Sequence, residues 1–161
     1  MRAVAFSTRG QQTMTSEKRL RGLKERAIEE NESAYGAEAR ERYGDGAVDA
    51  AKERVRAMSE EDWNSLRELE QAVIRQLKVA MATEDPAGAE AQELVDLHRR
   101  WICGYWGEGR YSAQAHLALG EMYLADERFR DYYDSRAGAG ATEFLEAALR
   151  ARLGEGQAEV D

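Results

Sequence analysis

Between Ser59 and Thr83 the apolar side chains return every three or four residues, the spacing that places them on one face of an α-helix. Ser59 followed by Asp62 resembles a capping box, and the run stops at Glu84-Asp85-Pro86, which contains the chain's only proline. The pattern predicts a helix over residues 60–83, the longest of the chain. Its expected buried stripe consists of Trp63, Leu66, Leu69, Val73, Leu77 and Ala80.

The same spacing recurs in shorter segments separated by glycines, and no sustained alternation of apolar and polar residues indicates a strand. The first helix is expected to begin after Thr15 or Ser16 and to weaken or break at Gly36. The sequence predicts one compact all-α domain of six to eight helices over residues 14–153, between disordered tails at 1–13 and 154–161. Further helices are expected over 37–43, 47–58, 87–106, 112–125, 126–136 and 142–153.

The formal net charge of −8 argues against nucleic-acid binding by this chain itself, because phosphate contacts require clustered Lys and Arg. No apolar run approaches the length of about 20 residues that spans a bilayer, so no membrane association is expected. The single cysteine, Cys103, allows no internal disulfide and fits a reducing cytoplasm. His98 and His116 are isolated in sequence and form no metal-ligand motif.

Residues 97–133 hold both histidines, the cysteine and eight of the thirteen aromatic residues. Most of these aromatics are Tyr or Trp, which combine an apolar face with a polar group and suit a half-solvated concave surface. Two interpretations remain open at this point: an aromatic part of the core, or the wall of a binding site. The loop at Gly107–Arg110 would let the two aromatic helices diverge.

Little in the sequence indicates catalysis, and no enzyme activity is expected. His116 has no evident Ser, Cys or carboxylate partner, and Cys103 lies within a helical pattern that favours an inert thiol. His98 or His116 is a conceivable haem ligand, but a lone histidine in an apolar stripe more often has a structural hydrogen bond. We therefore expect no cofactor and favour a pocket for a large organic ligand.

The segment HLALGEMYLADERFRDYYD (116–134) resembles the signature of TipA-type antibiotic-binding domains, the effector domains of MerR-family multidrug regulators. Four further blocks fit the family in the same order: AEARERYGD (37–45), SEEDW (59–63), DPAGAEAQELVDLHRRW (85–101) and EFLEAAL (143–149). The resemblance covers about residues 14–152.

The resemblance implies a globin-like helical domain with a broad hydrophobic cleft for thiopeptide-like antibiotics. It also implies that the N-terminal segment 14–45 is a mobile lid, carrying Ile28, Tyr35 and Tyr43. The implied ligand-binding residues are Trp101, Tyr105, Trp106, Tyr111, His116, Met122, Tyr123, Phe129, Tyr132 and Tyr133. Ile102 and Leu119 are expected to belong to the ordinary core.

Two departures from the family refine the expected function. No winged helix or coiled coil precedes the domain in this sequence, so a stand-alone drug-binding protein is expected beside the effector domain of a transcriptional activator. The loop before His116 reads GEGRYSAQAH and has no cysteine, so covalent capture of a ligand is not expected. The predicted partner is a hydrophobic antibiotic, bound by a cytoplasmic monomer or weak dimer. The alternative is a helical interaction module whose aromatic patch contacts another protein.

Overall fold

The computed structural model describes the backbone of residues 2–154 and the side chains of residues 15–154. Within this part the chain is all-α, as predicted: eight α-helices and three short helical turns, without a strand. Its contacts divide the chain into two units, the first ending at Trp63 and the second beginning at Asn64. We describe the two units separately and call them the first and the second unit.

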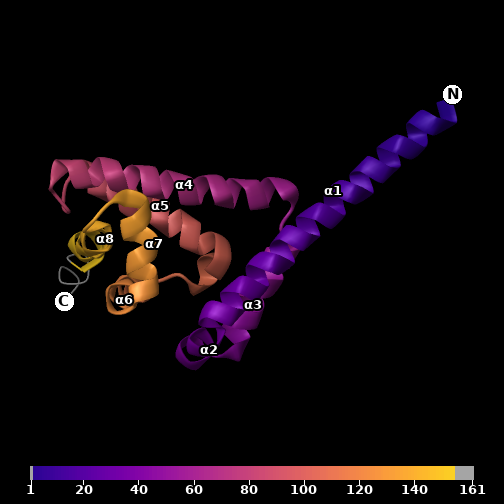
Figure 1. Cartoon of the computed structure of the whole chain (residues 1–161). Helices are drawn as coiled ribbons and strands as arrows, with labels where there is room; N and C mark the ends of the chain where they lie inside the picture. Colours follow the sequence, from indigo (N-terminus) through magenta and orange to yellow (C-terminus); the bar gives the residue numbers. More distant parts are fainter. Residues whose placement is uncertain (1, 155–161) are drawn as a thin grey trace. The chain divides into compact units, whose positions relative to one another are not determined.

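The first unit consists of α1 (Arg2–Asn31), the π-helical turn η1 (Glu32–Gly36), α2 (Ala37–Tyr43) and α3 (Asp45–Ala57). α1 packs against α3 (Figure 1). The buried Lys24 ammonium donates hydrogen bonds to the carbonyls of Arg56, at 3.0 Å, and Met58. These carbonyls lie at the C-terminal end of α3, where unpaired acceptors and the helix dipole favour a cation.

Polar contacts add to this small interface. Arg40 donates to Glu32, Asp45 and Asp49, and Lys52 pairs with Glu32 at 2.7 Å. Buried apolar side chains are few among the described residues of the first unit: Ile28, Val55, Met58 and Trp63. Since apolar burial supplies most of the stability of a packed helix, the first unit has a weak core.

Two predictions that concern the first helix are wrong. α1 begins at Arg2 rather than at Thr15 or Ser16, because no proline interrupts residues 2–14 and Ser and Thr are tolerated within a helix. With 30 residues it is longer than the 24-residue helix starting at Glu60. The weakening predicted at Gly36 is confirmed: α1 gives way to the π-helical turn η1, which ends at Gly36, and the second predicted helix, Ala37–Tyr43, ends at Gly44, with φ 85°. Met1 and the tail expected beyond Gly154 lie outside the described residues.

The second unit contains most of α4 (Glu60–Thr83), α5 (Ala89–Trp106), the 3-10 turn η2 (Glu108–Arg110), α6 (Ala113–Ala125), α7 (Glu127–Ala137), α8 (Ala141–Leu149) and the π-helical turn η3 (Arg150–Gly154). The short helix α8 packs against α5, α6 and α7 (Figure 1). Its Leu145 and Leu149 are fully buried. Ile102 and Leu119 are buried in the same core, as predicted.

The predicted helix boundaries from α4 onward are largely confirmed, because the capping side chains act as expected. The Ser59, Ser112 and Asp126 side chains accept hydrogen bonds from the backbone N–H groups at Asp62, Ala115 and Arg128, at 3.1, 3.0 and 2.9 Å. Such bonds satisfy donors that a helix start leaves unpaired. α5 and α7 end at glycines with positive φ, which only glycine adopts without strain. None of the helices between residues 2 and 154 is long and apolar enough to cross a membrane.

Gly120 allows α6 to approach α8 closely. A Cβ atom there would lie 2.7 Å from Leu149 Cδ1, and Leu149 is fully buried. We expect Gly120→Ala to lower the free energy of unfolding by about 1–2 kcal/mol, because overpacking outweighs the gain in helix propensity of about 1 kcal/mol. Urea unfolding followed by circular dichroism measures this. Gly22→Ala in α1 is the control: no atom lies within 4 Å of its added Cβ, so it should not destabilise the protein.

Candidate functional site

The aromatic residues of α5, α6 and α7 form one connected cluster in the second unit. Tyr123 of α6 lies at its centre, with ring centroids 5.1 Å from Phe129 and 5.0 Å from Tyr133. On the α5 side, the Trp101 ring lies 5.7 Å from both Tyr105 and His98. Helical spacing explains this gathering, since residues three or four apart share a face on each helix. The cluster therefore joins the two parts of the aromatic stretch that a loop separates in sequence.

A buried histidine pair connects α5 with α6. The rings of His98 and His116 are fully buried and stacked, and His98 Nδ1 lies 2.7 Å from His116 Nε2. The outer nitrogens are also engaged: His98 Nε2 lies 3.3 Å from the Tyr123 hydroxyl and His116 Nδ1 2.9 Å from the Tyr111 hydroxyl. The Tyr123 hydroxyl also bonds to Tyr133. A hydrogen-bonded chain therefore runs from the half-buried Tyr111 into the core.

Both histidines are held neutral. Burial, followed by the charge of His116, lowers the pKa of His98 well below its usual value. Burial, followed by the charge of Arg99, lowers the pKa of His116 to about 4. A neutral imidazole donates from one nitrogen and accepts at the other. All three hydrogen bonds therefore point the same way. Each group donates to the next, either from Tyr111 through both histidines to Tyr123 or from Tyr123 through both histidines to Tyr111.

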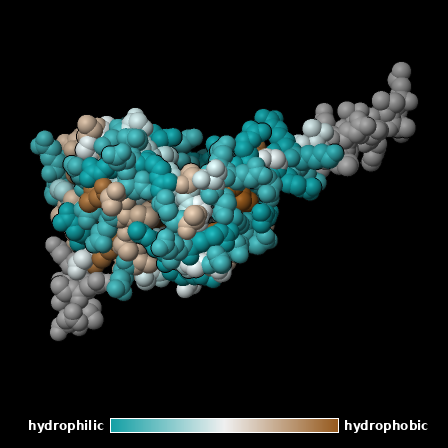
Figure 2. All heavy atoms as spheres, turned by 60° about the horizontal axis from the view of Figure 1, so that its bottom comes forward, coloured by the Kyte–Doolittle hydropathy of each residue, from teal (hydrophilic) through white to brown (hydrophobic). Residues whose placement is uncertain are grey.

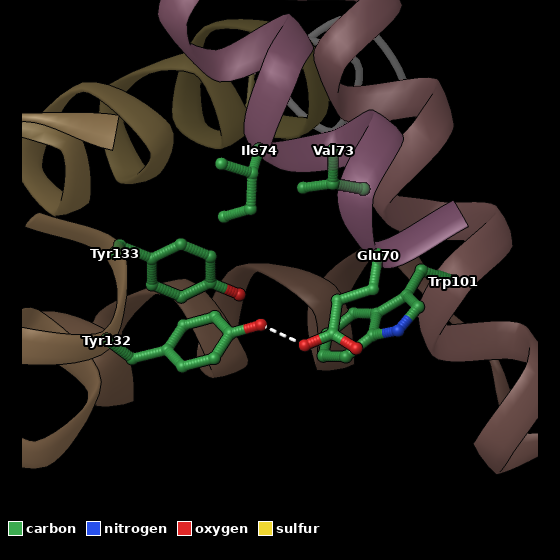
Figure 3. A pocket seen from close by; sticks show the side chains of 6 residues that line it. All are labelled: Glu70, Val73, Ile74, Trp101, Tyr132 and Tyr133. Carbon is green, nitrogen blue, oxygen red and sulfur yellow. Dashed lines mark hydrogen bonds between the residues drawn. The ribbon is translucent and has the colours of Figure 1, made fainter. Parts of the chain in front are cut away.

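A recess lies at the edge of this cluster, between α4, α5 and α7 (Figure 3). The Tyr132 hydroxyl donates a short hydrogen bond to Glu70 across it, shown as a dashed line in Figure 3. Burial, and then this hydrogen bond, raise the pKa of Tyr132 far above its usual value. The recess is lined by Glu70, Val73, Ile74, Trp101, Tyr132 and Tyr133.

The recess is small in this structure. It leaves essentially no room for a molecule the size of water, whereas a drug-sized ligand needs about 300–1,000 Å³. On the face shown in Figure 2, hydrophilic atoms predominate and hydrophobic atoms reach the surface in small groups. The aromatic side chains lie against one another here, so the broad hydrophobic cleft stays a prediction.

The predicted ligand-binding residues occupy two kinds of position. His116, Tyr123 and Tyr133 are buried, so a ligand reaches them only after rearrangement. The other members of the set are half-buried and can contact a ligand at the surface of the cluster: Trp101, Tyr105, Trp106, Tyr111, Met122, Phe129 and Tyr132. The structure brings Trp101, Tyr132 and Tyr133 together in the recess.

Sequence reasoning missed Glu70. Its spacing from Trp63, Leu66 and Val73 places it within the apolar stripe of α4, although we assigned that position to Leu69. A charged residue at an apolar position of a helix was the signal that would have singled it out. The pairing of His98 with His116 was also missed, because eighteen residues separate them in sequence.

The residues of the predicted lid lie in the first unit. Ile28 is buried, Tyr35 is half-buried and Tyr43 is exposed. Cys103, on the buried side of α5, has its pKa raised, first by burial and then by the charge of Glu108, which favours the unreactive thiol. Among the described residues, no group of three or more His, Cys, Asp or Glu side chains is placed to hold a metal ion.

Comparisons with known proteins agree with the sequence resemblance. A family model for the TipAS antibiotic-recognition domain matches residues 35–151. The HTH-type transcriptional activator mta of Bacillus subtilis is 31% identical over 146 residues, which is 89% of this chain and 54% of that protein. The HTH-type transcriptional activator TipA of Streptomyces coelicolor is 31% identical over 125 residues, covering 73% of this chain and 46% of its own length.

The TipA protein of Streptomyces lividans matches equally well. No solved structure matches the chain. The chain spans about half the length of these curated relatives, and the match includes all of the aromatic cluster on α5, α6 and α7. The chain belongs to the family of TipAS antibiotic-recognition domains.

Proposed function

We propose that this chain binds amphipathic macrocyclic or polycyclic antibiotics, thiopeptides among them, through the half-buried aromatic residues around Trp101. The observation that carries the proposal is the aromatic cluster itself, which lies within the segment matched by the antibiotic-recognition family. Trp and Tyr provide flat apolar faces together with an indole N–H or a hydroxyl, which suits large ligands with scattered polar groups. Binding proceeds without chemical change of the ligand.

The energetics of such binding are consistent with aromatic stacking. A nanomolar complex needs about −12 kcal/mol. Each stacked aromatic pair contributes roughly 0.5–1.5 kcal/mol beyond the burial of its surface. A macrocycle that covers several of these rings gains part of the required free energy by stacking and the rest by excluding water from apolar surface.

The relatives, which are described as transcriptional activators, support a role of binding in the control of transcription. We infer that the chain serves as the ligand-sensing part of a cytoplasmic activator of this kind, or as a stand-alone antibiotic-binding protein. In either role the ligand acts by stabilising one conformation over another, which requires a segment with two accessible states.

The predicted lid, residues 14–45, is a candidate for that segment. The first unit buries few apolar side chains, and regions with few buried apolar contacts open at low free-energy cost. We expect the amides of residues 15–43 to exchange with deuterium within seconds without ligand and to become protected when an antibiotic is bound. Hydrogen exchange followed by mass spectrometry measures both states, and strong protection in the free protein would contradict the lid.

Binding itself is tested by fluorescence and thermal stability. Trp63→Phe leaves Trp101 and Trp106 as the only indoles, so a bound thiopeptide should quench the fluorescence of this variant. The midpoint of thermal unfolding should rise in parallel, because a ligand that binds the folded state stabilises it. Absence of both effects across a panel of thiopeptides and polycyclic antibiotics would exclude the proposed function. A dimer that hides the aromatic residues and excludes ligand would instead indicate a protein-interaction module.

A further inference from the structure

We propose that the Tyr111 hydroxyl is a fixed hydrogen-bond donor for a carbonyl oxygen of the ligand, because the buried chain of hydrogen bonds behind it turns its proton outward. We call the series Tyr111, His116, His98, Tyr123 and Tyr133 the histidine chain. The part of the inference that concerns the ligand rests on the proposed function, whereas the direction of the histidine chain is a property of the protein alone. The inference adds a residue that selects ligands by the polarity of one group.

The inner end of the histidine chain can donate only toward the histidines. Tyr133 is 2% exposed, and its hydroxyl bonds to Tyr123. The recess beside Tyr133 has essentially no room for a water molecule, and the Glu70 carboxylate there bonds to Tyr132 and not to Tyr133 (Figure 3). Among the described residues, the Tyr123 oxygen is thus the acceptor available to the Tyr133 proton. A buried donor that lacks an acceptor is costly, so Tyr133 donates to Tyr123.

The direction at Tyr133 fixes the direction of the other bonds. The Tyr123 hydroxyl has one proton, and within the chain His98 Nε2, at 3.3 Å, is the atom that can accept it. A neutral imidazole that accepts at Nε2 carries its proton on Nδ1, so His98 Nδ1 donates to His116 Nε2 at 2.7 Å. By the same rule His116 Nδ1 donates to the Tyr111 oxygen at 2.9 Å. Both histidines are therefore Nδ1–H tautomers.

The outer end of the histidine chain has a different environment. Tyr111 is half-buried, so a group from outside the protein core can meet its hydroxyl. Because the Tyr111 oxygen accepts from His116, the Tyr111 proton is available to such a group. A carbonyl oxygen of an amide, ester or ketone accepts this proton, whereas a ligand that presents an N–H or O–H here would meet another donor.

Arg99 makes the same edge favourable for an acceptor. Its guanidinium carbon lies 4.3 Å from the centroid of the Tyr111 ring. Burial raises the pKa of Tyr111, and the charge of Arg99 acts in the opposite direction, which strengthens the hydroxyl as a donor. The Glu108 carboxylate lies 4.0 Å from Arg99, but both side chains are more than half exposed, so their pairing is weak. The positive charge beside Tyr111 also attracts the partial negative charge of a carbonyl oxygen.

The direction is tested by NMR of the full chain labelled with ¹⁵N-histidine. The chain contains only two histidines, and the nitrogen signals distinguish a ring nitrogen that carries a proton from one that does not. We expect both rings of the free protein at pH 7 to be Nδ1–H tautomers. Two Nε2–H tautomers, or an even mixture of both forms, would overturn the inference.

Two variants show whether Tyr133 sets the direction. Tyr123→Phe removes the link between Tyr133 and the histidines while it keeps the aromatic ring, so both tautomers should become populated. Tyr132→Phe is the matched control: it removes a neighbouring hydroxyl that bonds to Glu70 outside the histidine chain, and the tautomers should not change. Pure Nδ1–H tautomers in Tyr123→Phe, or a mixture in the control, would overturn the inference.

The ligand contact is tested by calorimetric titration with thiostrepton, which contains many amide carbonyls. Tyr111→Phe should weaken binding about tenfold, which corresponds to about 1.4 kcal/mol, and the histidines of the bound wild-type chain should stay Nδ1–H tautomers. Ser135→Ala, which removes an exposed hydroxyl of α7, should leave the affinity unchanged. Equal affinity of Tyr111→Phe and the wild type, or conversion to Nε2–H tautomers on binding, would overturn the proposed contact.

The same measurements separate the two proposals. A chain with Nε2–H tautomers that binds thiostrepton would contradict the direction of the histidine chain and leave the proposed function intact. A chain with Nδ1–H tautomers that binds no thiopeptide or polycyclic antibiotic would contradict the proposed function, while the direction of the histidine chain would stand.

Discussion

Acidification from pH 7 to pH 5 should lower the free energy of unfolding by at least about 2 kcal/mol, before most carboxylates titrate. His116 has a folded-state pKa of about 4, against an ordinary value of 6.5. The unfolded chain therefore binds more protons than the folded chain in this range, so stability falls as the pH falls below 6.5. The loss from His116 alone is about 2 kcal/mol at pH 5 and about 3 kcal/mol near pH 4.

His98 adds to the same loss, because its pKa is lowered in the same direction. Protonation of both rings would place two donors at the 2.7 Å contact between the histidines and so break their hydrogen bond. Urea unfolding at pH 7.0, 6.0, 5.0 and 4.5 measures the effect. Below this window Glu32 and Asp126 contribute as well, since hydrogen bonds to cationic side chains lower their pKa values.

A variant without the titrating pair separates these causes. His98→Gln combined with His116→Gln should be less stable at pH 7, but its stability should change little between pH 7 and pH 5. A flat profile for the wild-type chain would show that the pair is not held neutral by burial. An equally steep profile for the double variant would place the titration elsewhere.

The second large effect concerns the centre of the second unit. Leu145 of α8 is fully buried where α8 meets α5, α6 and α7. Leu145→Ala should lower the free energy of unfolding by about 3–5 kcal/mol, because it removes buried apolar surface and leaves a cavity that packed helices cannot close. Near-ultraviolet circular dichroism should weaken in parallel, since the aromatic cluster of α5, α6 and α7 packs around the same core.

Val79→Ala is the control for that experiment. Val79 lies on α4 and is 49% exposed, so its truncation should change the stability by less than about 0.5 kcal/mol. A loss for Leu145→Ala that is as small as the loss for Val79→Ala would contradict the central position of α8.

The sequence predicted the second unit better than the first, and the reasons are physical. Ser112 and Asp126 act locally: a cap bonds to a backbone amide two or three residues away, so the boundary can be read from the sequence. The start of α1 was predicted wrongly, because Thr15 and Ser16 are good caps but are also tolerated within a helix.

The sequence pattern did not predict which helices contact one another. The face of α5 that carries His98 and the face of α6 that carries His116 were each predicted, but nothing in a helical pattern states which faces meet. Glu70 was overlooked for a related reason, since its hydrogen-bond partner, Tyr132, lies sixty-two residues later in the sequence. The family resemblance predicts the site on the aromatic helices, and the geometry adds the histidine pair and the recess.

The most direct test of antibiotic binding is a calorimetric titration of the full chain with thiostrepton, in parallel for the wild type and for Trp101→Ala. Trp101 contacts both the aromatic cluster and the recess and is half-buried, so it is available to a ligand. We expect saturable one-to-one binding with a dissociation constant of about 1 μM or lower, weakened at least about thirtyfold, or about 2 kcal/mol, by Trp101→Ala. Absence of binding by a folded wild-type chain, or equal affinity of the two proteins, would contradict the account.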